Sequence, residues 1–150
     1  PLGEGKWFSK FRSNYLDVSN DPLYPFGFGL SYTQFSYSDV KLSTSSPKGN
    51  QSVTASVTVT NTGKAEGKEV VQLYLRDLVG SVTRPVQELK GFQKIALKPG
   101  ESKTISFTIT PETLKFYNYD LKYVWEPGEF EIMIGGNSRD VKKAKLNWSR

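Results

Sequence analysis

The sequence contains no cysteine and no histidine among its 150 residues. The absence of cysteine excludes disulfide bonds and thiolate metal sites within this chain, and it leaves the redox compartment undecided. The absence of histidine removes the commonest metal ligand, the commonest general base and any Ser–His or Cys–His nucleophile pair. We therefore expect no metal site and no cofactor in this chain.

Long apolar runs are also missing. No run of apolar residues approaches the roughly 20 residues that would span a bilayer, so we expect no membrane contact. The chain begins with Pro1 and not with methionine, which suggests a piece of a longer polypeptide. The lack of a signal peptide then carries no information about location.

The overall composition is that of a globular domain. At 150 residues, with 37% hydrophobic and 23% charged residues, the chain is long enough for one domain with a core. Its net charge of +5 is spread along the sequence, and only Arg139, Lys142, Lys143 and Lys145 come close to clustering. A solvated edge strand decorated with lysines explains this cluster, so we expect no nucleic-acid partner.

Most of the chain alternates between apolar and polar residues, which is the pattern of half-buried strands. In residues 53–60, VTASVTVT, valine or alanine occupies every second position, with threonine or serine between. Similar stretches are FSYSDVKLS, KEVVQLYLRD, SKTISFTIT, EFEIMIGG and VKKAKLNW. The second face of KEVVQLYLRD is only partly polar, so we expect something to cover Tyr74. The last stretch is predicted with a phase slip at Lys142 and Lys143.

Two segments depart from simple alternation. Residues 82–101 contain Pro85, Gly91, Pro99 and Gly100, which predict short extended pieces. Pro111 suits the first position of a helix and Thr110 suits its cap, which predicts one helical turn and nothing longer.

These elements predict an all-β fold. About seven strands lie between Phe35 and Trp148, separated by NTG, PG and GGN turns. This spacing is typical of an immunoglobulin or fibronectin type III-like antiparallel β-sandwich. Residues 1–34 lie outside the pattern, so we predict an irregular aromatic extension over 1–34 and the sandwich over 35–150.

Several residues invite a chemical interpretation that their neighbours disfavour. Glu129 and Glu131 would lie roughly 6.5 to 7 Å apart on one strand face, but Phe130 and Ile132 point to the core, which places both carboxylates on the solvated side. The glycine-containing stretches GFGLS and IGGNS precede no helix that could receive a phosphate, so both are interpreted as turns.

Exposed aromatic residues raise a second possibility, because flat rings can stack on sugars. Trp7, Trp125 and Tyr123 are the candidates, and for Trp125 packing is favoured over sugar binding.

Four blocks in order carry a resemblance to a known family. They are PLYPFGFGLSY, VTVTNTGKAEGKEVVQLYLRD, RPVQELKGFQKIALKPGES and EPGEFEIMIGGNS. Together they resemble the C-terminal fibronectin type III-like domain of glycoside hydrolase family 3, the family of β-glucosidases and β-xylosidases, from about Asp21 to Trp148. The preceding stretch resembles the approach to this domain in periplasmic enzymes of the family.

The resemblance implies a partner and a location. The complete enzyme would carry a catalytic barrel and an α/β domain upstream, with the Asp nucleophile and the acid/base group of a retaining glycosidase, and it would be periplasmic or extracellular. No position of this chain matches those motifs, so we predict no catalytic residue here. PLYPFGFGLSY would be the connector, and its rings would be buried at the junction with the upstream catalytic domains. A homodimer contact is a further option. The predicted docking residues are Trp7, Phe8, Phe11, Tyr24, Phe26, Phe28 and Tyr32.

Two other classes of function stay open at this stage. The first is an independent carbohydrate-binding or adhesion sandwich that works without a catalytic domain. The second, and weaker, is an enzyme contained within this chain. Binding to a glucan would favour the first, and hydrolysis of an aryl β-glucoside would favour the second.

Overall fold

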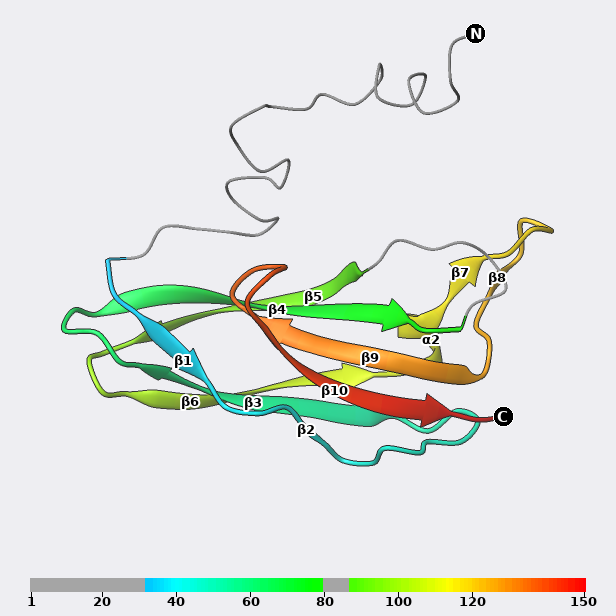
Figure 1. Cartoon of the computed structure of the whole chain (residues 1–150), viewed down its shortest axis with the longest axis horizontal. Helices are drawn as coiled ribbons and strands as arrows, with labels where there is room; N and C mark the ends of the chain where they lie inside the picture. The colour runs from blue at the N-terminus through cyan, green and yellow to red at the C-terminus, as the bar shows by residue number, and fades with distance from the viewer. Residues whose placement is uncertain (1–31, 80–86) are drawn as a thin grey trace, which may run out of the picture.

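The structure, a computed structural model, describes residues 32–79 and 87–150. Within these ranges the chain forms two stacked antiparallel sheets, which confirms the predicted β-sandwich (Figure 1). One layer contains β1 (Phe35–Tyr37), β2 (Lys41–Leu42), β3 (Val53–Asn61) and β6 (Ser102–Ile109). The other has the order β10 (Val141–Trp148), β9 (Gly128–Gly135), β4 (Gly67–Asp77) and β5 (Glu88–Leu97).

The alternation in β3 produces the first layer. Every second residue from Val53 to Asn61 is buried, and β3 pairs with β6 from Val53↔Ile109 to Thr60↔Ser102. The polar residues form a ladder on the outer face, where Thr60 and Ser102 hydroxyls lie 2.7 Å apart. The division into a buried apolar face and an outer polar face confirms the prediction from the sequence, and hydroxyl contacts join β3 to β6 on the outer face.

The central strand β4 is buried on both faces. Val71, Leu73 and Leu75 belong to the core, while Gln72 and Tyr74 on the other face are only 5% and 2% exposed. The Tyr74 hydroxyl donates to Gln72 Oε1, and Gln72 Nε2 donates to the Gly136 carbonyl at 2.9 Å. The prediction that Tyr74 is covered is confirmed.

Three local predictions are wrong. The stretch FSYSDVKLS, predicted as one strand over residues 35–43, forms two short strands, β1 and β2, that both pair with β3. Residues 88–97, predicted as short extended pieces, form one continuous strand. A bulge opposite Leu73 and Tyr74 shifts the pairing register near Gly91 without ending the strand. The last strand has no phase slip, since Lys142 and Lys143 keep regular partners in β9.

A short crossover segment follows β6. The predicted helical turn is α2 (Pro111–Leu114), which begins after Thr110 and buries Leu114 completely. The chain then forms a two-stranded hairpin of β7 (Phe116–Tyr117) and β8 (Tyr123–Val124), which projects from one end of the sandwich (Figure 1). The sequence pattern does not predict this hairpin.

Trp148 joins the two layers near the chain end. Its side chain is fully buried, and its indole N–H donates to the Gly49 carbonyl at 3.0 Å. Backbone bonds reinforce this contact, from Asn147 N–H to Ser45 O at 2.8 Å and from Ser149 N–H to Pro47 O at 3.0 Å. The last strand of one layer is therefore fastened to the loop before β3 of the other.

Replacing Trp148 with phenylalanine should destabilise the chain by roughly 2–4 kcal/mol, because it opens a cavity in the core and removes the hydrogen bond to the partly buried Gly49 carbonyl. Urea unfolding, with the slope compared between variants, measures this loss. Trp125→Phe is the matched control at a half-buried tryptophan and should cost less than about 1.5 kcal/mol. Equal losses at the two positions would contradict the role assigned to Trp148.

Candidate docking surface

Among the predicted docking residues, the structure describes Tyr32 alone. Its side chain is fully exposed, with a relative accessibility of 103%. The predicted residues Trp7, Phe8, Phe11, Tyr24, Phe26 and Phe28 lie outside the described residues. Their docking role stays a prediction, and Tyr32 has the exposure that such a role needs.

Asn61 forms a hydrogen-bonding hub directly beside Tyr32. The Asn61 side chain is completely buried, and its Oδ1 accepts from Thr33 Oγ1 at 2.7 Å and from Gly63 N–H at 3.0 Å. Its Nδ2 donates to the carbonyls of Ala65 and Leu97, both at 2.9 Å. A buried amide needs such partners, and here they tie Thr33 to β3 and β5. The position at which the chain enters the sandwich is thereby fixed.

Gly63 permits this close approach. A Cβ atom at Gly63 would clash with Thr33 Oγ1 and would lie 2.9 Å from the Gln34 N atom. The stretch NTG is interpreted from the sequence only as a turn, because Thr33, which contacts Gly63, lies 30 residues away in the chain. The Asn61 hub is thus a site that the sequence analysis misses.

A second group of exposed apolar residues lies on the β7–β8 hairpin. We call residues 116–124 the tyrosine hairpin. Phe116 anchors it with 8% exposure, whereas Tyr117, Tyr119, Leu121 and Tyr123 are 66%, 77%, 81% and 52% exposed. Figure 1 places it at the end of the sandwich opposite to the β3–β4 turn that contains the Asn61 hub.

The tip of the tyrosine hairpin is held in a fixed but strained shape. Asn118 Oδ1 accepts from the N–H groups of Asp120 and Lys122, each at 3.0 Å, and Leu121 N–H donates to Asn118 O at 3.0 Å. This geometry puts Leu121 at φ 57°, in the left-handed region where glycine or asparagine is usual. The rings of Tyr117 and Tyr123 contact each other at a tilt of 39°, with their centroids 5.0 Å apart.

The two glutamates of β9 differ from each other. Glu129 is exposed, as predicted. The Glu131 side chain is only 12% exposed, because it lies between Arg76 and Lys143, with both N–O distances at 4.0 Å. The prediction of a solvated position is therefore wrong for Glu131, which is covered by the cations of its neighbouring strands.

Trp125 packs, as favoured by the sequence analysis. It is half-buried against the core and meets Trp148 edge-on, with ring centroids 6.3 Å apart. Trp7 lies outside the described residues, and Tyr123 belongs to the tyrosine hairpin.

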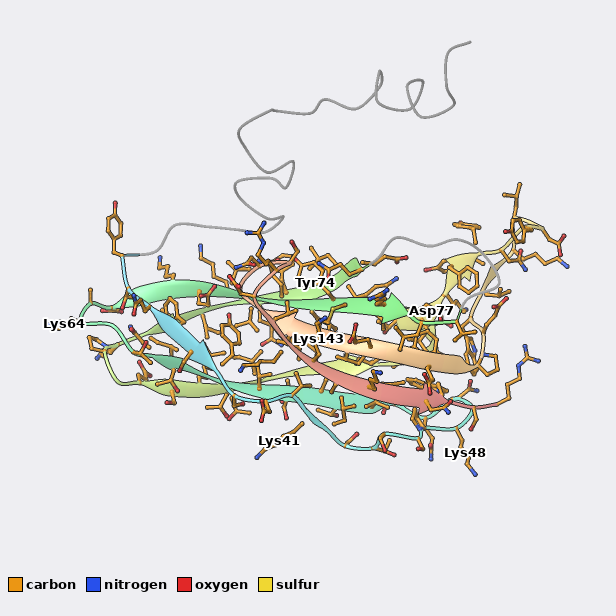
Figure 2. All side chains as sticks on the ribbon, in the orientation of Figure 1. Lys41, Lys48, Lys64, Tyr74, Asp77 and Lys143 are labelled. Atoms are coloured by element: carbon orange, nitrogen blue, oxygen red, sulfur yellow. The ribbon has the colours of Figure 1, made fainter. Side chains whose placement is uncertain are left out.

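The basic cluster lies where the sequence places it. Lys142, Lys143 and Lys145 belong to β10, an edge strand of its sheet, and Figure 2 shows Lys143 on that strand. Arg139 belongs to the preceding turn, where the Asn137 side chain accepts from the N–H groups of Arg139 and Asp140, both at 2.9 Å. The interpretation of IGGNS as turn chemistry is confirmed, and GFGLS lies outside the described residues.

Two pockets lie on the described surface. One, of about 370 Å³, is lined by Tyr37, Arg139, Asp140, Val141 and Lys142. The other, of about 160 Å³, is lined by Ser45, Glu129, Lys145, Leu146 and Asn147. Each carries a single carboxylate, whereas a retaining glycosidase needs two that face each other across the sugar.

A polar pair is partly buried beside the larger pocket. Within the described part of the chain, the Tyr37 hydroxyl is buried without a hydrogen-bond partner, and burial raises its pKa, with a further contribution from Glu69. Burial likewise raises the pKa of the Glu69 carboxyl, and the Val70 N–H, which donates to it at 2.9 Å, partly opposes that shift.

Comparison with known proteins identifies the domain. Residues 69–138 match the family model of the fibronectin type III-like domain. The chain contains a fibronectin type III-like domain. Within the described residues, no helix is both long and apolar enough to cross a membrane.

The relatives of this fibronectin type III-like domain are much longer glycosidases. It is 56% identical over 138 residues to the periplasmic β-glucosidase of Salmonella typhimurium, covering 92% of this chain and 18% of the relative. It is 48% identical over 147 residues to a β-xylosidase of Formosa agariphila, covering 97% and 20%. A crystal structure of the Listeria innocua β-glucosidase with glucose superposes with a TM-score of 0.83 at 39% identity, covering 100% and 21%. The chain spans about a fifth of the length of these relatives.

Replacing Asn61 with alanine should destabilise the domain by roughly 2–4 kcal/mol, because the buried groups of Thr33 and Leu97 lose their hydrogen bonds to Asn61. Urea unfolding of the 150-residue chain measures the change. Thr62→Ala, at the exposed neighbouring residue, is the control and should cost about 0.5 kcal/mol or less. An Asn61→Ala variant as stable as the control would show that the hub is dispensable.

Replacing Glu69 with glutamine should stabilise the domain at pH 7. Because the pKa is raised in the folded state, the ionised carboxylate opposes folding, so stability falls as pH rises through the shifted pKa. Below the unfolded pKa, near pH 4, Glu69 is protonated in both states and the advantage of glutamine should vanish. Thermal unfolding between pH 4 and pH 8 tests this, with Glu66→Gln in the preceding turn as the exposed control. A destabilised Glu69→Gln variant at pH 7 would contradict it.

Proposed function

We propose that this chain is the non-catalytic C-terminal domain of a family 3 glycoside hydrolase, and that it docks on the upstream catalytic domains and stabilises their arrangement. The supporting observation is the pattern of coverage. The likeness to glycosidases extends over 92–100% of this chain but over only 18–21% of the relatives, so most of such a polypeptide would lie elsewhere.

The complete polypeptide would hydrolyse O-glycosyl bonds, with a β-glucosidase as the first expectation. Both carboxylates of a retaining mechanism would then belong to the upstream domains. A periplasmic or extracellular location follows from the same likeness. The Salmonella typhimurium relative is named as a periplasmic β-glucosidase.

The Asn61 hub gives the docking a mechanical basis. The connector with Tyr24, Phe26 and Phe28 would leave the catalytic part and meet the sandwich at Thr33, which the buried Asn61 holds at 2.7 Å. Tyr32, adjacent and fully exposed, would continue the aromatic contact away from the sandwich core. A short rigid attachment of this kind costs less ordering entropy on docking than a flexible linker.

Replacing Tyr24, Phe26 and Phe28 together with serine should lower the thermal inactivation midpoint of the complete enzyme by several degrees. The reason is that the aromatic contact area with the catalytic domains is lost. The same changes should leave the unfolding midpoint of the 150-residue chain within about 1 °C. Lys41→Ser is the control, since Figure 2 shows Lys41 pointing away from the sandwich. An equal loss of stability in the isolated chain would place the rings in the sandwich's own core and refute the docking.

Two assays of the isolated chain separate the other functions. A calorimetric titration with a soluble β-glucan should show no saturable binding, and incubation with an aryl β-glucoside should show no turnover. Saturable binding would establish an independent carbohydrate-binding module. Turnover abolished by a single substitution in this chain would establish an enzyme.

A further inference from the structure

The tyrosine hairpin carries four exposed apolar side chains, those of Tyr117, Tyr119, Leu121 and Tyr123, which the proposed function leaves unused. We propose that it is a second docking element, which packs on the protein surface of the upstream catalytic part of the same polypeptide. This inference rests on the proposed function and adds a contact at the opposite end of the sandwich from the connector.

In the described part of the chain, the hairpin extends neither of the two sheets of the sandwich, and β7 and β8 pair with each other. Strands β7 and β8 form a separate two-stranded sheet, and an isolated hairpin of two strands is marginally stable in water. Its outward residues are nevertheless three tyrosines and a leucine, all at least half exposed. Strand β4 ends at the same end of the sandwich as the hairpin (Figure 1), and Val79, two residues further along the chain, is 70% exposed. Such clustering marks a contact surface.

The backbone of Leu121 is held in a strained conformation. A leucine at φ 57° is unfavourable by about 1 kcal/mol or more, and this residue is also 81% exposed, so the isolated domain gains nothing from it. Glycine or asparagine would relieve the strain at this position. A leucine held rigidly outward by the Asn118 bonds is suited to insert into an apolar pocket of a partner.

A sugar fits this surface less well than a protein. The Tyr117 ring lies 5.0 Å from the Tyr123 ring, centroid to centroid, and the Lys115 ammonium group lies 5.9 Å from the centroid of the Tyr123 ring, so neighbours in this chain already cover part of the Tyr123 ring. Leu121, at the tip, cannot hydrogen-bond to hydroxyl groups. Apolar atoms and rigid aromatic side chains are typical of the centre of a protein–protein contact.

The available area favours a tethered partner over a second copy. Aromatic side chains bury roughly 150–250 Å² each, so the exposed parts of the four residues amount to on the order of 500 Å². A symmetric dimer through this hairpin would bury about twice that, which is below the roughly 1,200–2,000 Å² of a stable interface. A partner in the same polypeptide benefits from a millimolar effective concentration, and about a fifth of each relative's length matches this chain.

The position of the hairpin gives the contact a purpose. Figure 2 shows Lys64, beside the Asn61 hub, at one end of the sandwich and Asp77, at the end of β4, toward the other end, where the hairpin projects. A domain held at one end can pivot about that point. A second contact at the far end would fix its orientation on the catalytic part.

The decisive variant is Leu121→Asn, because it removes the apolar contact and relieves the strain together. In the 150-residue chain its unfolding midpoint should rise by about 2 °C. In the complete polypeptide the inactivation midpoint of the glycosidase activity should instead fall by about 2–4 °C. Lys122→Gln at the neighbouring position is the control and should change neither midpoint. A rise in both forms would overturn the proposal.

Hydrogen–deuterium exchange gives an independent readout. The amides of residues 116–124 should exchange at least tenfold more slowly in the complete polypeptide than in the isolated chain. Protection that grows with the concentration of the isolated chain would identify a second copy as the partner, and protection by added soluble β-glucan would identify a sugar. Either result would overturn the proposal.

The same experiment separates this inference from the proposed function. If the hairpin exchanges equally in both forms while the connector rings still stabilise the complete enzyme, the second contact is refuted and the proposed function stands. If the hairpin amides exchange equally in both forms and the connector substitutions have the same effect on stability in both forms, the second contact and the proposed function are both refuted.

Discussion

The burial of two apolar sheet faces against each other determines the rest of this structure. One core cluster contains alternate residues of β3 and β6 from one layer and of β4 and β9 from the other. Because side chains alternate along a strand, a slip of one residue in β3 would exchange its buried valines for threonines. The core thus fixes the register of the strands that contribute to it, and it leaves the two ends of the sandwich as the places where exposed structure can vary.

The sequence predicts the parts of the fold in which one local signal dominates. The alternation in residues 53–60 and 102–110 is regular, and β3 and β6 lie there. Near Gly91 the local signal is misleading, because glycine and proline suggest breaks. The pairing with β4 instead keeps β5 continuous through a bulge. Long-range pairing overrides local propensity at this strand.

The two candidate contacts escape prediction for different reasons. The tyrosine hairpin has aromatic residues at alternate positions, but its tip lacks the glycine that tight hairpins usually carry, and Leu121 takes the left-handed position instead. The Asn61 hub joins residues that are far apart in sequence, from Thr33 to Leu97, so only the folded arrangement brings its partners together. Asn61 is interpreted from the sequence as a turn former, because nothing local indicates that its amide will be buried against Thr33 and Leu97.

The two contacts also differ in how their energy would be used. The Asn61 hub lies inside the sandwich, where each bond replaces one with water, so its main effect is to hold the first described residues in one direction. The tyrosine hairpin is exposed, so its apolar surface contributes only when another surface covers it. A rigid attachment at one end restricts where the other end can reach, which lowers the entropy that a second contact must overcome. The stiffness provided by Asn61 and by the core would therefore make a small hairpin surface sufficient to orient the whole domain.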